Sequence, residues 1–315
     1  MAADTSQSRA PSPFDPAAVE PETAAFNAAL EAQLAELPRP MDLPVALTRR
    51  ARAEGRGVFP LQGPRDTAHW VEDGPAGLRL TPGPGAPRGT YLHIHGGGWT
   101  FNAPEQYDAT NRMLAEAAGC DVVSVRYRLG PEHRWPACAE DCLAAAQWVL
   151  ETRPGPVVIG GESAGAHLAL VTLLALRDAG RIGRVAGAAL SYGMYDLRGT
   201  PSLRNWGERY LILSTPVVDW FVGNLMGGRE RGDPAASPLL ADLAGLPPAL
   251  LQVGTADPLL DDSLFLAARL EAAGGAAELQ VAPGGVHAFD QFDLGIARKA
   301  LAARAGFLKA RLAAG

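Results

Sequence analysis

The sequence predicts an α/β fold with a mostly parallel central sheet and helices on both faces. From about residue 89 onward, short apolar, β-prone runs alternate with longer stretches of helical spacing. Strands that alternate with helices are usually joined by crossover connections, so these strands are expected to run parallel. A glycine-rich pentapeptide, residues 161–165, lies between one such run and a helical stretch. With 47% apolar residues in a chain of 315, the composition allows a large core.

The predicted elements follow from this alternation. The predicted strands cover residues 90–94, 122–125, 157–159, 186–190, 249–253 and 279–281. The predicted helices cover residues 105–118, 137–151, 164–179, 260–273 and 291–312. Nearer the N-terminus, Phe26, Leu30 and Leu34 recur at every fourth position, which predicts an amphipathic helix within residues 17–37. Residues 1 to about 16 are expected to form a disordered or draped tail.

Residues 198–232 interrupt the alternation, because they have no strand pattern but carry large apolar side chains. Thr215 followed by Pro216 is a typical helix start, and the glycines at 227 and 228 are a typical stop. We therefore expect a helical insertion that packs with the N-terminal helix as a small cap. The predicted organisation is an N-terminal tail and cap helix (1–55), a first core part (56–197), the cap insertion (198–232) and a second core part (233–315).

Charge and cysteine content exclude several classes of partner and compartment. The chain has 28 basic and 34 acidic residues, a net charge of −6, which argues against nucleic acid or an anionic membrane as main partner. Its three cysteines are too few for a disulfide framework, which favours a reducing compartment. No signal peptide or membrane-spanning run is visible, so a cytoplasmic location is expected.

The pentapeptide Gly161 to Gly165 has the pattern G-x-S-x-G in a strand–turn–helix context. Such a turn strains the backbone and lifts the central Ser163 hydroxyl clear of the sheet edge. The glycines two residues before and after the serine allow the chain to fold back on itself. The helix that follows favours negative charge at its N-terminus. Ser163 is therefore a candidate nucleophile.

A second glycine-rich segment, His95-Gly96-Gly97-Gly98-Trp99, follows the predicted strand 90–94. Consecutive glycines expose backbone N–H groups, which suit the oxyanion of a tetrahedral intermediate. A flexible loop is an alternative interpretation. A metal site built on His93 and His95 is another, but no third ligand lies nearby in the sequence, and we expect no metal.

Together these motifs resemble the α/β-hydrolase fold and, within it, the hormone-sensitive lipase-like esterases, over about residues 88–312. Three further segments are similar to this family: YRLGPEHRWPA at 127–137, GTADPL at 254–259 and VHAF at 286–289. Two positions depart from the usual pattern: Glu162 stands where many relatives have Asp, and Ala166 where a second Gly is frequent. Neither departure removes a catalytic atom.

The order Ser163, Asp257, His287 is that of the α/β-hydrolase triad. Asp257 and His287 each follow a predicted strand, so both are expected at the carboxyl edge of the sheet. Asp261 and Asp262 are rival carboxylates, but they lie at a predicted helix start.

The resemblance further implies an oxyanion hole formed by the N–H groups of Gly97, Gly98 and Ala164. For the substrate pocket we expect four aromatic side chains: Trp99, Phe101, Trp206 and Tyr210.

The function expected from these residues is a serine carboxylic ester hydrolase acting on short-to-medium acyl esters of small molecules, without a cofactor. Two alternatives remain open. One is an amide- or lactone-cleaving or acyl-transfer enzyme with the same triad. The other is a non-catalytic ligand-binding member of the fold. A monomer or a homodimer is expected.

Overall fold

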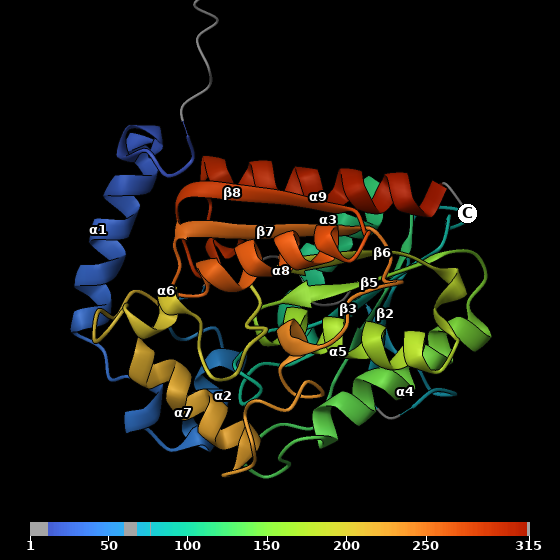
Figure 1. Cartoon of the computed structure of the whole chain (residues 1–315), viewed down its shortest axis with the longest axis horizontal. Helices are drawn as coiled ribbons and strands as arrows, with labels where there is room; N and C mark the ends of the chain where they lie inside the picture. The colour runs from blue at the N-terminus through green and yellow to red at the C-terminus, as the bar shows by residue number, and fades with distance from the viewer. Residues whose placement is uncertain (1–11, 60–67, 76, 314–315) are drawn as a thin grey trace, which may run out of the picture.

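The computed structural model describes residues 12–59, 68–75 and 77–313, and an eight-stranded sheet forms its centre (Figure 1). Across the sheet the strand order is β1-β2-β4-β3-β5-β6-β7-β8. The strand bounds are β1 His69–Trp70, β2 Leu78–Thr81, β3 Thr90–Ile94, β4 Asp121–Val125, β5 Val157–Glu162, β6 Val185–Ser191, β7 Ala249–Ala256 and β8 Ala277–Val286. Strand β2 pairs antiparallel with β1 and β4, whereas the pairs from β4 to β8 are parallel.

Helices cover both faces of the sheet. Helices α3 (Asp108–Ala118) and α9 (Gly295–Ala313) lie on one face, and α4 (Ala137–Thr152), α5 (Ala164–Asp178) and α8 (Leu260–Ala272) lie on the other. The buried apolar side chains form two core clusters, which lie mainly on opposite faces of the sheet. Consecutive strand residues point to opposite faces, so Tyr91 belongs to the cluster under α3 and α9, and Leu92 belongs to the larger cluster on the other face. Burial on both faces explains why the central strands are continuous apolar runs.

Each of the six predicted strands coincides with one of β3 to β8, and the structure extends most of them by a few residues. Strands β1 and β2 were not predicted, because they are short and precede the alternation that begins near residue 89; β1 forms the edge of the sheet, and β2 lies between β1 and β4. The stretch predicted as a helix at 105–118 divides into a 3₁₀ turn, Pro104–Tyr107, and α3. The helix predicted from residue 291 begins at Gly295, because the 3₁₀ turn Phe289–Gln291 precedes it.

Four further helices gather at one end of the sheet: α1 (Pro21–Ala35), α2 (Val45–Ala53), α6 (Pro201–Arg204) and α7 (Thr215–Met226) (Figure 1). As predicted, α7 begins at Thr215, and Gly227, whose φ of +57° is left-handed, terminates it after Met226. Helix α2 was not predicted; it is short, and none of its residues is fully buried. Most of the predicted tail, residues 1–11, lies outside the described residues.

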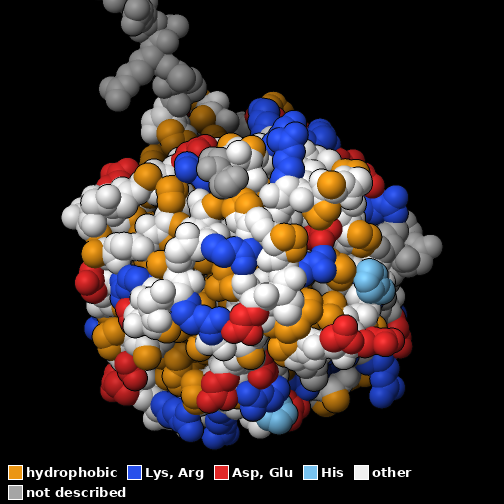
Figure 2. Space-filling model, turned by 90° about the vertical axis from the view of Figure 1, so that its right-hand side faces the viewer, with side chains coloured by type: hydrophobic (Ala, Val, Ile, Leu, Met, Phe, Trp, Pro, Cys, Tyr) orange, Lys and Arg blue, Asp and Glu red, His pale blue; other side chains and the backbone are white. Residues whose placement is uncertain are grey.

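Segments far apart in the sequence meet at this end of the sheet. Arg209 donates to both carboxylate oxygens of Glu31 on α1, each at 2.8 Å. Within the described ranges, no helix is long and apolar enough to cross a membrane. On the face shown in Figure 2, positive and negative side chains are interspersed, and neither sign dominates.

Candidate active site

Three predicted catalytic residues each follow directly after a strand. Ser163 follows β5, Asp257 follows β7, and His287 follows β8. Because β5, β6, β7 and β8 are parallel neighbours, their carboxyl ends meet at one edge of the sheet. Residues separated by as many as 124 positions in the sequence therefore lie together.

A continuous chain of hydrogen bonds joins these three side chains. The Oγ of Ser163 lies 2.8 Å from Nε2 of His287, and Nδ1 of His287 lies 2.9 Å from Oδ2 of Asp257. The other carboxylate oxygen, Oδ1, accepts the N–H of Leu259 at 2.9 Å. Asp257 and His287 are buried, whereas Ser163 is partly exposed. The carboxylate is thus fixed in place and orients the imidazole toward the hydroxyl.

The backbone at Ser163 is strained, with φ +57° and ψ −121°. Such a conformation persists only where the surroundings enforce it. The turn is held close to β3: a Cβ added at Gly161 would lie 2.0 Å from the carbonyl oxygen of Ile94, and one at Gly165 only 1.9 Å from it. Only glycine fits at these two positions, which explains the spacing of the motif.

The glycine loop after β3 lies beside Ser163. A Cβ added at Gly96 would lie 3.3 Å from the Cβ of Ser163. Gly97 and Gly98 have φ values of +120° and +59°. A Cβ at Gly98 would lie 2.3 Å from the Phe221 ring, so a side chain there would collide with α7. Gly97, Gly98 and Ala164 line the same cavity as Ser163.

This cavity has a volume of about 370 Å³ and is mostly apolar. Of the four aromatic residues expected around it, Trp99 and Tyr210 line it, and Phe101 and Trp206 do not. Phe101 is fully buried behind the wall, where its ring packs edge-on against Phe221. Trp206 is turned aside, and its indole N–H donates to the carbonyl of Arg209 at 2.8 Å.

Tyr192 lines the cavity but was not predicted from the sequence. Its ring lies edge-on to the imidazole of His287, with 5.0 Å between centroids. Its hydroxyl donates to Oδ1 of Asp290 at 2.5 Å. The sequence signal that could have identified Tyr192 is its position two residues after the predicted strand 186–190. The residues that follow the parallel strands lie at the same edge of the sheet as the other site residues.

Two buried histidines near the site have structural partners. His167 donates from Nε2 to the carbonyl of Ala236 at 2.8 Å and accepts the indole N–H of Trp99 at 3.2 Å. His95 stacks on Tyr127 with 4.3 Å between ring centroids. Burial lowers the pKa of His167 to about 4 and the pKa of His95 to about 3, so both rings are neutral near pH 7.

A buried polar network lies beneath the nucleophile. Glu162 accepts from Nη1 of Arg304 at 2.7 Å, and its second oxygen lies 2.8 Å from Nε2 of His93. Arg304 also donates to Asp290 at 2.6 Å. Burial raises the pKa of Glu162, but His93 and Arg304 outweigh it and hold the pKa below its usual value. His93, considered above as a metal ligand, is thus a partner of Glu162 and Ser124.

Comparison with known proteins agrees with this geometry. The family model of the alpha/beta hydrolase fold matches residues 91–291, which is more than half of the chain. The chain belongs to the α/β-hydrolase family. The match covers the glycine loop, the serine turn and the loops that carry Asp257 and His287.

Curated relatives of this α/β-hydrolase include two bacterial enzymes. The carboxylic ester hydrolase LipN of Mycobacterium tuberculosis (strain ATCC 25618 / H37Rv) is 35% identical over 70% of this chain. The match spans 64% of the length of LipN. An acetyl esterase of Salmonella paratyphi A is 32% identical over 71% of this chain and 72% of its own length.

Solved structures resemble this α/β-hydrolase over almost its whole length. A hormone-sensitive lipase from a metagenome library is 27% identical, with a TM-score of 0.83, covering 92% of this chain and 98% of its own. A hyperthermophilic esterase from Pyrobaculum calidifontis is 29% identical, with a TM-score of 0.80, and the match covers 93% of this chain and 98% of the esterase. The mostly parallel sheet with helices on both faces therefore belongs to a fold that this chain shares with a solved hormone-sensitive lipase and a solved esterase.

Proposed function

We propose that this chain is a serine carboxylesterase that hydrolyses small-molecule esters through Ser163, His287 and Asp257. The observation that carries the proposal is the hydrogen-bond chain from the Ser163 hydroxyl through the imidazole to a buried carboxylate. The names of the relatives, an ester hydrolase and an acetyl esterase among them, support the same reaction.

In the proposed mechanism, Nε2 of His287 takes the hydroxyl proton as Oγ of Ser163 attacks the ester carbonyl carbon. Asp257 accepts the N–H at Nδ1 and stabilises the imidazolium that forms. The oxyanion of the tetrahedral intermediate accepts hydrogen bonds from the N–H groups of Gly97, Gly98 and Ala164. His287 then protonates the departing alcohol, and a water activated by the same imidazole hydrolyses the acyl-enzyme. The reaction needs no cofactor.

We propose further that the described part of the N-terminal segment, residues 12–55, and the insertion 198–232 form a cap that limits the length of the acyl chain. Leu47 from α2, and Tyr210 and Phe221 from the insertion, line the cavity and support this role. Each methylene that fits adds up to about 0.8 kcal/mol of burial, roughly a fourfold preference. Once a bounded cavity is full, the next methylene collides with its wall and the preference reverses.

The test is kcat/KM for p-nitrophenyl esters from acetate to dodecanoate, with Ser163→Ala as the matched variant. We expect a maximum between acetate and hexanoate and a steep fall by decanoate. Ser163→Ala is expected to lose about 10⁶ in kcat without a change in melting temperature, because the small hydroxyl adds little to packing. A maximum at dodecanoate, or a variant with a few per cent of the activity, contradicts the proposal. Faster cleavage of the anilide of the same acid, or of a lactone, than of the p-nitrophenyl ester also contradicts the proposal.

The proposed location is the cytoplasm, and the proposed assembly is a monomer or a homodimer. The location is supported by Cys120, Cys138 and Cys142, which are free and buried, as a reducing compartment maintains them. Cell fractionation and light scattering of the purified protein test the two statements separately.

A further inference from the structure

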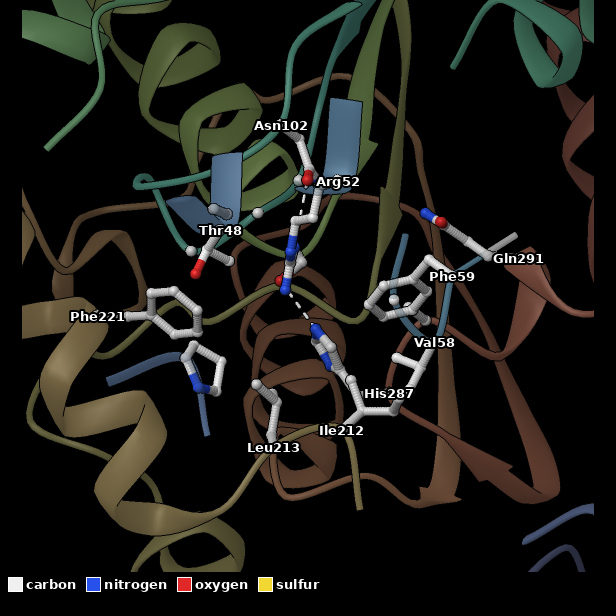
Figure 3. A pocket seen from close by; sticks show the side chains of 18 of the residues that line it. Thr48, Arg52, Val58, Phe59, Asn102, Ile212, Leu213, Phe221, His287 and Gln291 are labelled. Atoms are coloured by element: carbon white, nitrogen blue, oxygen red, sulfur yellow. Dashed lines mark hydrogen bonds between the residues drawn. The ribbon is translucent and has the colours of Figure 1, made fainter. Parts of the chain in front are cut away.

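Arg52 places a positive charge in the cavity that holds Ser163 and His287. It lies on α2, and its side chain reaches toward the space that His287 faces (Figure 3). Its Nη1 donates to Oδ1 of Asn102 at 3.2 Å. The guanidinium carbon lies 4.6 Å from the ring centroid of Phe101 and 5.6 Å from that of Phe59. The two rings hold the cation in a fixed place by cation–π attraction.

No carboxylate in the described part of the chain forms an ion pair with Arg52. Two nearby arginines differ in this respect: Arg49 on the same helix binds Glu132, and Arg56, which also lines the cavity, binds Glu54. Among the described lining residues the one carboxylate is Glu162. Both of its oxygens are already taken by Arg304 and His93.

A guanidinium in an apolar cavity is costly unless an anion accompanies it. Burial lowers the pKa of Arg52, yet arginine keeps its charge at any ordinary pH. Asn102 occupies only one end of the guanidinium, and the planar fork of arginine matches the two oxygens of a carboxylate. The site therefore has a charge and donors in place for an anionic part of a ligand.

We propose that the preferred substrates are esters that also carry a carboxylate, and that Arg52 binds this carboxylate. This inference rests on the proposed esterase function and adds the substrate class. The carboxylate can belong to the acyl part or to the alcohol part of the ester, and the experiment below tests each position with a separate pair of esters. A role of Arg52 limited to fastening α2 onto Phe101 predicts no discrimination between charged and neutral esters.

The test compares two pairs of esters that differ in charge. Monoethyl glutarate against ethyl hexanoate places the carboxylate on the acyl side, and ethanol release is measured. 4-Acetoxybenzoate against its methyl ester places it on the alcohol side, and acetate release is measured. The enzymes are wild type, Arg52→Met, Arg52→Lys and the control Arg50→Met. Arg50 lies on the same helix but is exposed and does not line the cavity, so its variant loses the same charge outside the site.

We expect wild type to prefer the charged member of at least one pair. Arg52→Met is expected to lower kcat/KM for that charged ester by about 10- to 100-fold, the usual loss of a hydrogen bond to a charged group. The neutral member is expected to change by less than about threefold, Arg52→Lys to restore part of the loss, and Arg50→Met to leave both members unchanged. Equal losses on charged and neutral esters, or no charge preference in either pair, overturn the proposal.

A measurement on wild type alone covers the case in which Arg52→Met does not fold. Glutarate is expected to inhibit hydrolysis of ethyl butyrate competitively, and the neutral diamide of glutarate is not. Equal inhibition by both compounds overturns the proposal for Arg52. If wild type hydrolyses neither charged nor neutral esters, it is the proposed esterase function that fails.

Discussion

Arg304 and Glu162 form an ion pair beneath the nucleophile, with Nη1 2.7 Å from Oε1 and side chains only 2% and 4% exposed. Glu162 directly precedes Ser163 in the chain. Arg304 also binds Asp290, whose second oxygen holds the hydroxyl of Tyr192. The pair therefore links the C-terminal helix α9 to the serine turn and, through Tyr192, to the surroundings of His287.

Replacing Arg304 by Met is expected to destabilise the protein by about 3–5 kcal/mol, because it leaves the carboxylates of Glu162 and Asp290 buried without their cation. Urea denaturation followed by circular dichroism measures this loss. Arg298→Met is the control on the same helix, because Arg298 pairs with Asp293 at the exposed surface. We expect it to cost less than about 1 kcal/mol. Similar losses in the two variants contradict the structural importance of the buried pair.

Replacing Asp257 by Asn is expected to lower kcat by up to about 10⁴ while the fold persists, because the amide favours the wrong tautomer of His287. Asp262→Asn is the matched control in the same loop and helix region. Its carboxylate accepts the N–H groups of Tyr195 and Asp196 rather than contacting His287. If Asp262→Asn causes the larger loss of kcat, the acid of the triad is misassigned.

The rate is expected to fall on the acid side with the uptake of one proton, because only a neutral His287 accepts the proton of Ser163. Imidazoles commonly change charge between about pH 5 and 8. Burial holds the pKa of His95 at about 3 and that of His167 at about 4, so neither gains a proton in this interval. The measurement is kcat/KM against pH in constant ionic strength. A rate that does not fall at any acid pH at which the protein stays folded argues against His287 as the base.

Asp262 is expected to make the protein less stable as the pH rises from about 4 to about 7. Burial raises the pKa of Asp262 to about 7, against the opposing hydrogen bond from Thr200. In this interval the unfolded chain has lost the proton that the native state still holds, so the unfolding free energy falls with increasing pH.

Asp262→Asn removes this dependence, because the amide does not ionise. Urea denaturation at pH 5, 6, 7 and 8 measures the unfolding free energy of both proteins. We expect the unfolding free energy of the variant to rise relative to that of wild type as the pH increases. If the difference between the two unfolding free energies does not vary with pH, Asp262 does not titrate in this range.

Much of the site could be predicted because its residues follow strands. The runs that end at β5, β7 and β8 are visible as apolar patterns, and parallel pairing brings the next residues together. Arg304 gave no such signal, since it lies 142 positions from Glu162 in a helix of otherwise ordinary composition. Phe101 and Trp206 were expected in the pocket from their place in the sequence, but composition does not determine which side of a loop a ring faces. Arg52 was missed because α2 has only nine residues and was not recognised as a helix that faces the site.

The hydrogen-bonded residues of the site and the walls of its cavity come from different parts of the chain. The first follow strands of the sheet, whereas much of the wall is contributed by α2 and by the insertion that contains α7. Selection, or an engineer, can therefore alter the range of accepted esters by exchanging these two segments while the serine turn keeps its geometry. Transplanting residues 45–59 together with 198–232 from a relative is the smallest exchange that follows this division.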